Sequence, residues 1–268
     1  MLMRQSMLMS LQSFWLNGRR IERAGYLIGA LLLISGIAHL AILAVSGASW
    51  AGPLSLRKPA TFGLSFGITL VTIVWVASFL PLAERTRLAL LTIFTAASVV
   101  ETALVSLQAW RGVPSHFNVA TAFDALVARA LAVGGIALVV VIVGLTATAF
   151  RQNPAVPISL RRAIQVGFVA LCVAMATGAT MIARGMMLVF AGNPAAAYAT
   201  GGALKPTHAV TMHGILLLPL LAWLLSFADW SERRRLRVVL LASAAYVVLA
   251  SVIAIANISG WSLGGFAR

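Results

Sequence analysis

A carboxylate inside an apolar stretch is the first feature of this sequence that could do chemistry. Glu101 lies within the run SVVETALVSLQAW, and a polar segment follows it at once. That segment holds four polar residues: Arg111, His116, Asn118 and Asp124. An acidic group in apolar sequence is costly unless it meets other polar groups, and such groups often hold a proton or a ligand. Residues 98–124 are therefore the candidate site.

The elements that must position this stretch are membrane-spanning helices. Hydrophobic residues make up 61% of the 268 residues and charged residues only 10%, with a mean hydropathy of +0.98. Apolar runs of about 20 residues alternate with short basic segments, which is typical of helices that cross a bilayer. The net charge of +14 lies mainly in those short segments, so the expected partner is the lipid bilayer and no nucleic acid.

We predict an all-α, polytopic integral membrane bundle of seven transmembrane helices. The predicted spans cover residues 25–47, 60–82, 88–111, 125–150, 163–190, 207–228 and 237–258. They form a single domain, residues 25–268, because the connections are too short for a separate soluble domain. Lys and Arg are more frequent on the side of the N-terminus, which predicts a cytoplasmic N-terminus and a C-terminus outside. Pro219 is expected to kink the sixth span.

The first 24 residues form a cytoplasmic N-terminal segment of mixed polarity. Met3, Met7, Leu11 and Phe14 fall at helical spacing, which favours an amphipathic helix lying on the membrane. A disordered start is the alternative interpretation.

All the histidines are expected in the half of the bilayer that faces away from the cytoplasm. His39 and His213 lie within the first and sixth spans, His208 opens the sixth span, and His116 follows the third. Glu101 falls in the same half. Because imidazole and carboxyl groups are costly in hydrocarbon, we expect these side chains to face the bundle interior and one another.

Helical spacing supports inward-facing polar stripes. The stripe on the third span comprises Thr95, Ser98, Glu101 or Thr102, and Gln108. Arg184 closes a similar stripe on the fifth span, after Thr177 and Thr180.

Each of these residues also has a purely structural interpretation. His208 at a helix end suits the headgroup zone, and any of the histidines can bond to a helix carbonyl. Glu101 as a neutral acid would bond to Gln108 or Ser98 and clasp two helices. Arg111 and Lys205 would extend to lipid headgroups.

The motif Gln108-x-x-Arg111-Gly112-x-x-Ser115-His116-Phe117-Asn118, with the later pair His208-x4-His213, resembles a group of uncharacterised bacterial multi-spanning membrane proteins. The similarity covers most of residues 50–225. The chain departs from that group at Thr61, where a second Lys is usual, and in the length of the connection before Gly201. The resemblance implies a multi-pass protein of the bacterial inner (plasma) membrane, with no established activity.

Our first hypothesis is a redox or metal protein. His39 and His213, on separate spans at similar depth, would bind haem b or a transition metal ion, because neutral imidazole suits both. Glu101 and Arg184 would carry protons or pair with haem propionates. The remaining candidate ligand-binding residues are His208, His116, Arg111, Gln108, Asn118 and Asp124. A redox partner or a small-molecule ligand would complete the system.

Two alternatives remain open, so the sequence leaves enzyme, carrier and sensor undecided. In a proton-coupled carrier of a small anionic solute, Glu101 would bind the proton, and Arg184, Arg111 and Lys205 would line a vestibule. In a membrane-embedded metal hydrolase or sensor, Glu101 or Asp124 would serve as the acid beside a metal-bound water. His208 and His213 are five residues apart, so an undistorted helix does not point both at one metal ion.

Overall fold

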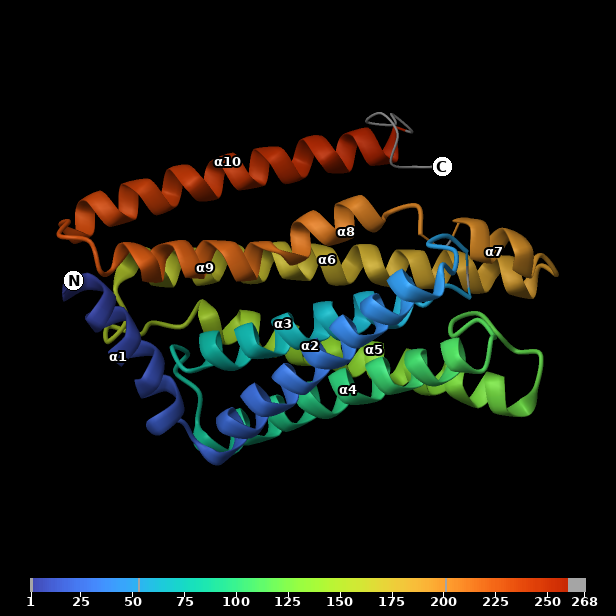
Figure 1. Ribbon diagram of the computed structural model, residues 1–268. Coiled ribbons are helices and arrows are strands. Elements are labelled where there is room, and N and C mark those ends of the chain that lie inside the picture. Colours follow the sequence, from blue (N-terminus) through green and yellow to red (C-terminus); the bar gives the residue numbers. More distant parts are fainter. Residues whose placement is uncertain (1, 53, 201, 260–268) are drawn as a thin grey trace. The chain divides into compact units, whose positions relative to one another are not determined.

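The structure is a computed structural model that describes residues 2–52, 54–200 and 202–259 (Figure 1). Every regular element in these ranges is a helix. The helices are α1 (Leu2–Leu16), α2 (Arg20–Ser46), α3 (Arg57–Ala77), α4 (Glu84–Trp110), α5 (Ala122–Ala149), α6 (Ile158–Phe190), α7 (Pro194–Thr200), α8 (Lys205–Met212), α9 (Gly214–Leu225) and α10 (Glu232–Ile258). The predicted all-α class is confirmed.

Seven helical segments of the described chain are long and apolar enough to cross a membrane. They are α2, α3, α4, α5, α6, α8 together with α9, and α10. Each corresponds to one predicted span, so the prediction of a seven-helix membrane bundle is confirmed. The direction in which the chain crosses the bilayer stays a prediction.

The chain divides into two compact units, which we describe separately. The N-terminal unit comprises residues 11–144, and the C-terminal unit comprises residues 1–10 and 145–268. That residues 25–268 act as a single domain stays a prediction.

Glycines bring α2 and α3 into backbone contact in the N-terminal unit, where Figure 1 shows these helices beside α4. A Cβ atom added at Gly63 would lie 2.6 Å from the backbone nitrogen of Gly36. One added at Gly67 would lie 2.7 Å from the nitrogen of Leu33. Small residues allow such close approach, which strengthens van der Waals packing between helices in a bilayer.

One face of α4 is buried along its whole length. The buried residues of this face recur every three or four positions and include Arg87, Leu91, Phe94, Ser98, Glu101, Val105 and Gln108. The first half of α5 covers part of this face, since Val127 and Leu131 pack on Val105. The face therefore positions both polar and apolar groups of the candidate site.

The end of α1 packs on the end of α3. Phe14 makes edge-to-face contacts with Trp75 and Phe79, with ring centroids 6.3 and 5.8 Å apart. These contacts hold α1 in place, and its interfacial location stays a prediction.

In the C-terminal unit, α6 contacts α7, α8, α9 and α10. The sixth span is interrupted at His213 and not at Pro219, which lies inside α9. Gly214 follows the interruption, and a Cβ atom there would lie 2.8 Å from Cβ of Ala170 on α6. The break therefore falls where the sixth span packs tightly on α6, and the expected kink at Pro219 stays a prediction.

Candidate functional site

Glu101 is a buried carboxyl group with an unpaired oxygen. The residue is 4% exposed, and its Oε1 atom has no hydrogen-bond partner among the described residues. Oε1 faces Gly134 of α5, where an added Cβ atom would lie only 2.5 Å from it. The two expected partners bond elsewhere, because Ser98 donates to the carbonyl of Phe94 and Gln108 contacts Asp124. The predicted clasp from Glu101 to Ser98 or Gln108 is therefore wrong.

A second polar stripe lies beside Glu101 on α4. Thr95, Thr102 and Ser106 fall at helical spacing, and their hydroxyl groups are buried with no hydrogen-bond partner among the described residues. Buried hydroxyl groups in proteins nearly always have a partner, either protein or ordered water. We call these three residues the hydroxyl stripe. Their hydroxyl groups are hydrogen-bonding groups close to Glu101 that no described protein group uses.

Four side chains meet where α4 ends and α5 begins. Gln108 donates to Oδ1 of Asp124 at 2.9 Å, and Arg111 donates to the same atom at 2.6 Å and also to Gln108. Thr121 donates to Oδ2 of Asp124 at 2.8 Å, while the amide of Asp124 donates to the Thr121 hydroxyl. Asp124 is 2% exposed. These four residues form the Asp124 cluster, which joins the two helices and caps the start of α5.

The Asp124 cluster provides Arg111 with an anionic partner inside the protein, in place of the lipid headgroup that the sequence suggested. Its guanidinium is bonded to Asp124 and lies 4.7 Å from the ring centre of Phe123. Its charge is therefore compensated within the protein.

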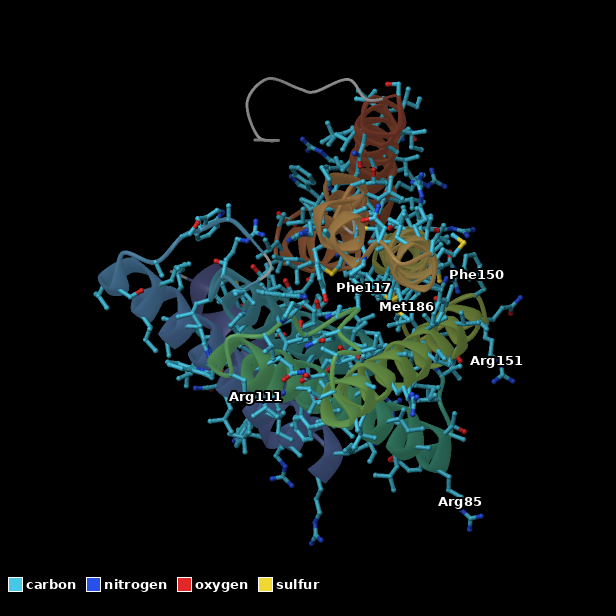
Figure 2. The ribbon with its side chains drawn as sticks, turned by 90° about the vertical axis from the view of Figure 1, so that its right-hand side faces the viewer. Arg85, Arg111, Phe117, Phe150, Arg151 and Met186 are labelled. Atoms are coloured by element: carbon cyan, nitrogen blue, oxygen red, sulfur yellow. The ribbon has the colours of Figure 1, made fainter. Side chains whose placement is uncertain are left out.

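The α4–α5 connection is a folded segment with buried side chains. Ser115 and Asn118 are 3% and 5% exposed, and Oδ1 of Asn118 accepts from the amide of Ala120. His116 contacts Ser115 at 3.0 Å, and its ring lies 5.8 Å from that of Phe62. Phe117 has a φ of 63°, a conformation that costs free energy for a residue with a side chain. Figure 2 labels Arg111 and Phe117 on this connection.

An apolar layer separates Glu101 from the Asp124 cluster. Val105, Val127 and Leu131 are 0%, 3% and 4% exposed and pack together. Phe62 and Leu104 pack against their outside. We refer to the first three residues as the apolar layer.

His39 links α2 to α4. Its Nδ1 donates to the carbonyl of Ser35 at 2.8 Å, and its Nε2 accepts the indole N–H of Trp110 at 3.0 Å. These partners assign the neutral tautomer with the proton on Nδ1. Both ring nitrogens are engaged, so His39 has no lone pair to offer an iron or another metal ion in this arrangement. Its present role is to join two helices.

In the C-terminal unit the two histidines have different surroundings. Nδ1 of His208 donates to the carbonyl of Ala174 at 2.7 Å, which ties α8 to α6. His213 is exposed, and its Nδ1 donates to Ala209 at 2.6 Å within its own turn. Arg184 is exposed near the end of α6. Among the described residues, no group of three or more His, Cys, Asp or Glu side chains is arranged to hold a metal ion.

The structure adds a buried ion pair that spacing alone did not single out. Arg87, 3% exposed, donates to the carbonyls of Ala77 and Leu80 at the end of α3 and lies 3.4 Å from Glu22. Glu22 in turn accepts the backbone N–H of Arg19 at the start of α2. One ion pair thus joins three helices. Extending the buried face of α4 back from Glu101 in steps of three and four residues leads to Arg87, which is the signal that identifies it.

These features define a multi-pass α-helical membrane protein with a polar centre in its N-terminal unit. No family model, curated protein or solved structure matches the chain. The resemblance to bacterial multi-spanning proteins stays a prediction.

The Trp110–His39 contact predicts a measurable loss of stability. Trp110→Phe removes the donor and leaves the Nε2 lone pair of a residue that is 8% exposed without a partner. We expect the free energy of unfolding to fall by about 1 kcal/mol, measured by denaturant titration of the detergent-purified protein. Trp50→Phe, at a site 58% exposed, should change it by less than about 0.5 kcal/mol. Equal effects of the two substitutions would contradict a linking role for His39.

Neutralising the centre of the Asp124 cluster should also weaken the fold. Asp124→Asn keeps the shape but turns charge-assisted hydrogen bonds from Arg111 and Gln108 into weaker ones. Because Arg111 is partly exposed, we expect a loss of about 1–2 kcal/mol in the free energy of unfolding, reduced at high salt. Arg111→Gln should lose a similar amount, and the double variant should lose less than the sum. Full additivity would show that the two residues do not act together.

Proposed function

We propose that this protein is a proton-coupled membrane carrier of a small solute in which Glu101 binds the proton. The observation that carries the proposal is the unpaired carboxyl of Glu101, 4% exposed and in the interior of a span. Burying an isolated carboxylate in apolar surroundings costs far more than taking up a proton. Ionisable groups inside membrane spans are rare, and they commonly mark proton and ion pathways.

The charges elsewhere in the N-terminal unit support the same proposal. Two other buried carboxylates have cationic partners, since Glu22 pairs with Arg87 and Asp124 pairs with Arg111. Glu101 has none, so its charge is the one that a bound proton would cancel. The hydroxyl stripe beside it offers groups that relay protons through water.

The class of solute is a separate part of this proposal. Arg111 is compensated by Asp124 and so contributes little to a binding site for an anion. Arg184 and Lys205 of the C-terminal unit are exposed and keep the anionic class open as a proposal. We place the carrier in the bacterial plasma membrane, with the α4–α5 connection outside.

Replacing the acid tests the proton site directly. Dicyclohexylcarbodiimide reacts with protonated carboxyl groups in apolar surroundings, so mass spectrometry should find its adduct on Glu101 and less of it as the pH rises. Glu101→Gln should abolish this adduct and any solute uptake that a pH gradient drives into proteoliposomes. Glu84→Gln, at an exposed carboxylate, should leave both unchanged. Lack of an adduct on Glu101 in the folded protein, or gradient-driven uptake by Glu101→Gln, would overturn the proposal.

A redox or metal role is the competing proposal, and His39 in its observed hydrogen bonds fits it poorly. The visible absorption spectrum and metal content of the purified protein decide it. A haem or metal band that disappears in both His39→Ala and His213→Ala would replace the carrier proposal. Hydrolysis of a membrane substrate that requires Glu101 and a bound metal would support the hydrolase alternative in the same way.

A further inference from the structure

The interface between α4 and α5 in the N-terminal unit is built in three layers. Nearest the connection is the Asp124 cluster, with Gln108 and Arg111 on α4 and Asp124 on α5. Next comes the apolar layer, and then Glu101 opposite Gly134. The order of the layers follows from the opposite directions of α4 and α5. Gln108, before the connection, pairs with Asp124, after it, so residues further from the connection on each helix meet in successive layers.

The layers set the length of the barrier. Glu101 and Gln108 are two helical turns apart, which is about 10 Å at 1.5 Å per residue. Val105 lies between them on the same face, and Val127 and Leu131 fill the matching positions of α5. A buried apolar layer of this kind opposes the passage of water and ions.

We infer that the apolar layer is a closed gate between Glu101 and the α4–α5 connection, and that the Asp124 cluster holds it shut. The inference rests on the proposed function, since it describes how the proton site is reached. The Asp124 cluster fixes the ends of α4 and α5 by three side-chain hydrogen bonds to one carboxylate. Val127 follows Asp124 by one helical turn, so freeing Asp124 from α4 removes the restraint on the layer below.

The apolar layer differs from a uniform apolar core because ionisable groups lie on both sides of it. The group below it is ionisable and unpaired, and the group above it is a charged network with one partly exposed member, Arg111. The apolar layer separates the two on the face that α4 turns to α5, and the hydroxyl groups of Thr102 and Ser106 on the neighbouring stripe of α4 have no hydrogen bond to Glu101 or to the Asp124 cluster. Such a barrier is what a coupled carrier requires, because an open path would dissipate the proton gradient.

Thiol accessibility tests the gate without depending on protonation of Glu101. Cys172 is the single native cysteine, so Cys172→Ala provides the background. On it, Glu101→Cys should fail to react with a charged, membrane-impermeant methanethiosulfonate over the time in which Val119→Cys, 51% exposed in the connection, reacts fully. Adding Leu131→Ala or Asp124→Asn to Glu101→Cys should raise its rate at least tenfold. Adding Leu126→Ala, at a site 61% exposed on α5, should not.

The outcomes separate the gate from the proton site. If Glu101→Cys reacts as fast as Val119→Cys, or if both opening variants stay unreactive while Val119→Cys still reacts, the gate is overturned. Should Leu131→Ala not purify as a monodisperse protein, Leu131→Val and Asp124→Asn decide the question. Failure of the carbodiimide adduct on Glu101 overturns proton binding instead, whichever result the thiol assay gives.

Discussion

Arg87→Ala is expected to lower the free energy of unfolding by about 3–5 kcal/mol. The guanidinium is 3% exposed and donates to the carbonyl of Ala77, the last residue of α3, and to that of Leu80 in the turn that follows. Its removal also leaves the carboxylate of Glu22, 4% exposed, with the exposed Arg19 as its remaining cationic partner. Breaking a buried pair by removing one member is costly because the other charge remains buried. Denaturant titration of the detergent-purified variant measures the effect.

Two comparisons show whether the ion pair is the cause. Arg85→Ala removes an arginine from the same turn, but the Arg85 side chain is exposed and extends away from the ribbon (Figure 2). Its effect should stay within about 0.5 kcal/mol. Glu22→Gln added to Arg87→Ala should recover part of the loss, because it removes the buried negative charge that then has only the exposed Arg19 as a partner. If Arg85→Ala and Arg87→Ala cost the same, the loss of positive charge at this end is responsible and the buried pair is not.

Periodicity explains why the helices and the buried face of α4 could be predicted. An apolar run of about 20 residues has few alternatives to a bilayer-spanning helix. Within one helix, spacing of three and four residues places side chains on one face, so burial of Thr95, Ser98 and Glu101 followed from the sequence. The same rule extended by four turns leads to Arg87. Charge near the end of a span usually signals orientation, so the sequence by itself does not distinguish Arg87 from a loop arginine.

The partners across helices could not be predicted, because they depend on contacts between distant parts of the chain. His39 bonds to Trp110, which lies 71 positions away, and nothing in the spacing of either helix selects that pair. The Asp124 cluster depends on the path of the connection, where Gly112 and Phe117 both have positive φ. Residue type and depth suggested a metal ligand at His39, whereas the hydrogen bonds indicate a helix link.

Gly63→Leu is expected to have the next largest effect, at or above the upper end of the about 1–3 kcal/mol that overpacking usually costs. Even a Cβ atom at this position would lie 2.6 Å from the nitrogen and 2.7 Å from Cα of Gly36. Those are backbone atoms, so no side chain can move aside, and α2 and α3 must separate. Separation also weakens the contact at Gly67, four residues along, which makes the loss larger than the volume of one side chain suggests.

Gly135→Ala provides the matched control for this prediction, since both substitutions remove a glycine from a membrane-spanning helix. A Cβ atom at Gly135 meets nothing within 4 Å, so alanine should raise the free energy of unfolding by up to about 1 kcal/mol through helix propensity. Opposite signs for Gly63→Leu and Gly135→Ala in the same denaturant titration are the expected result. If Gly63→Leu is as stable as the unaltered protein, α2 and α3 do not touch through their backbones. The position of α4 against these two helices, which includes the His39–Trp110 hydrogen bond, then also loses its support.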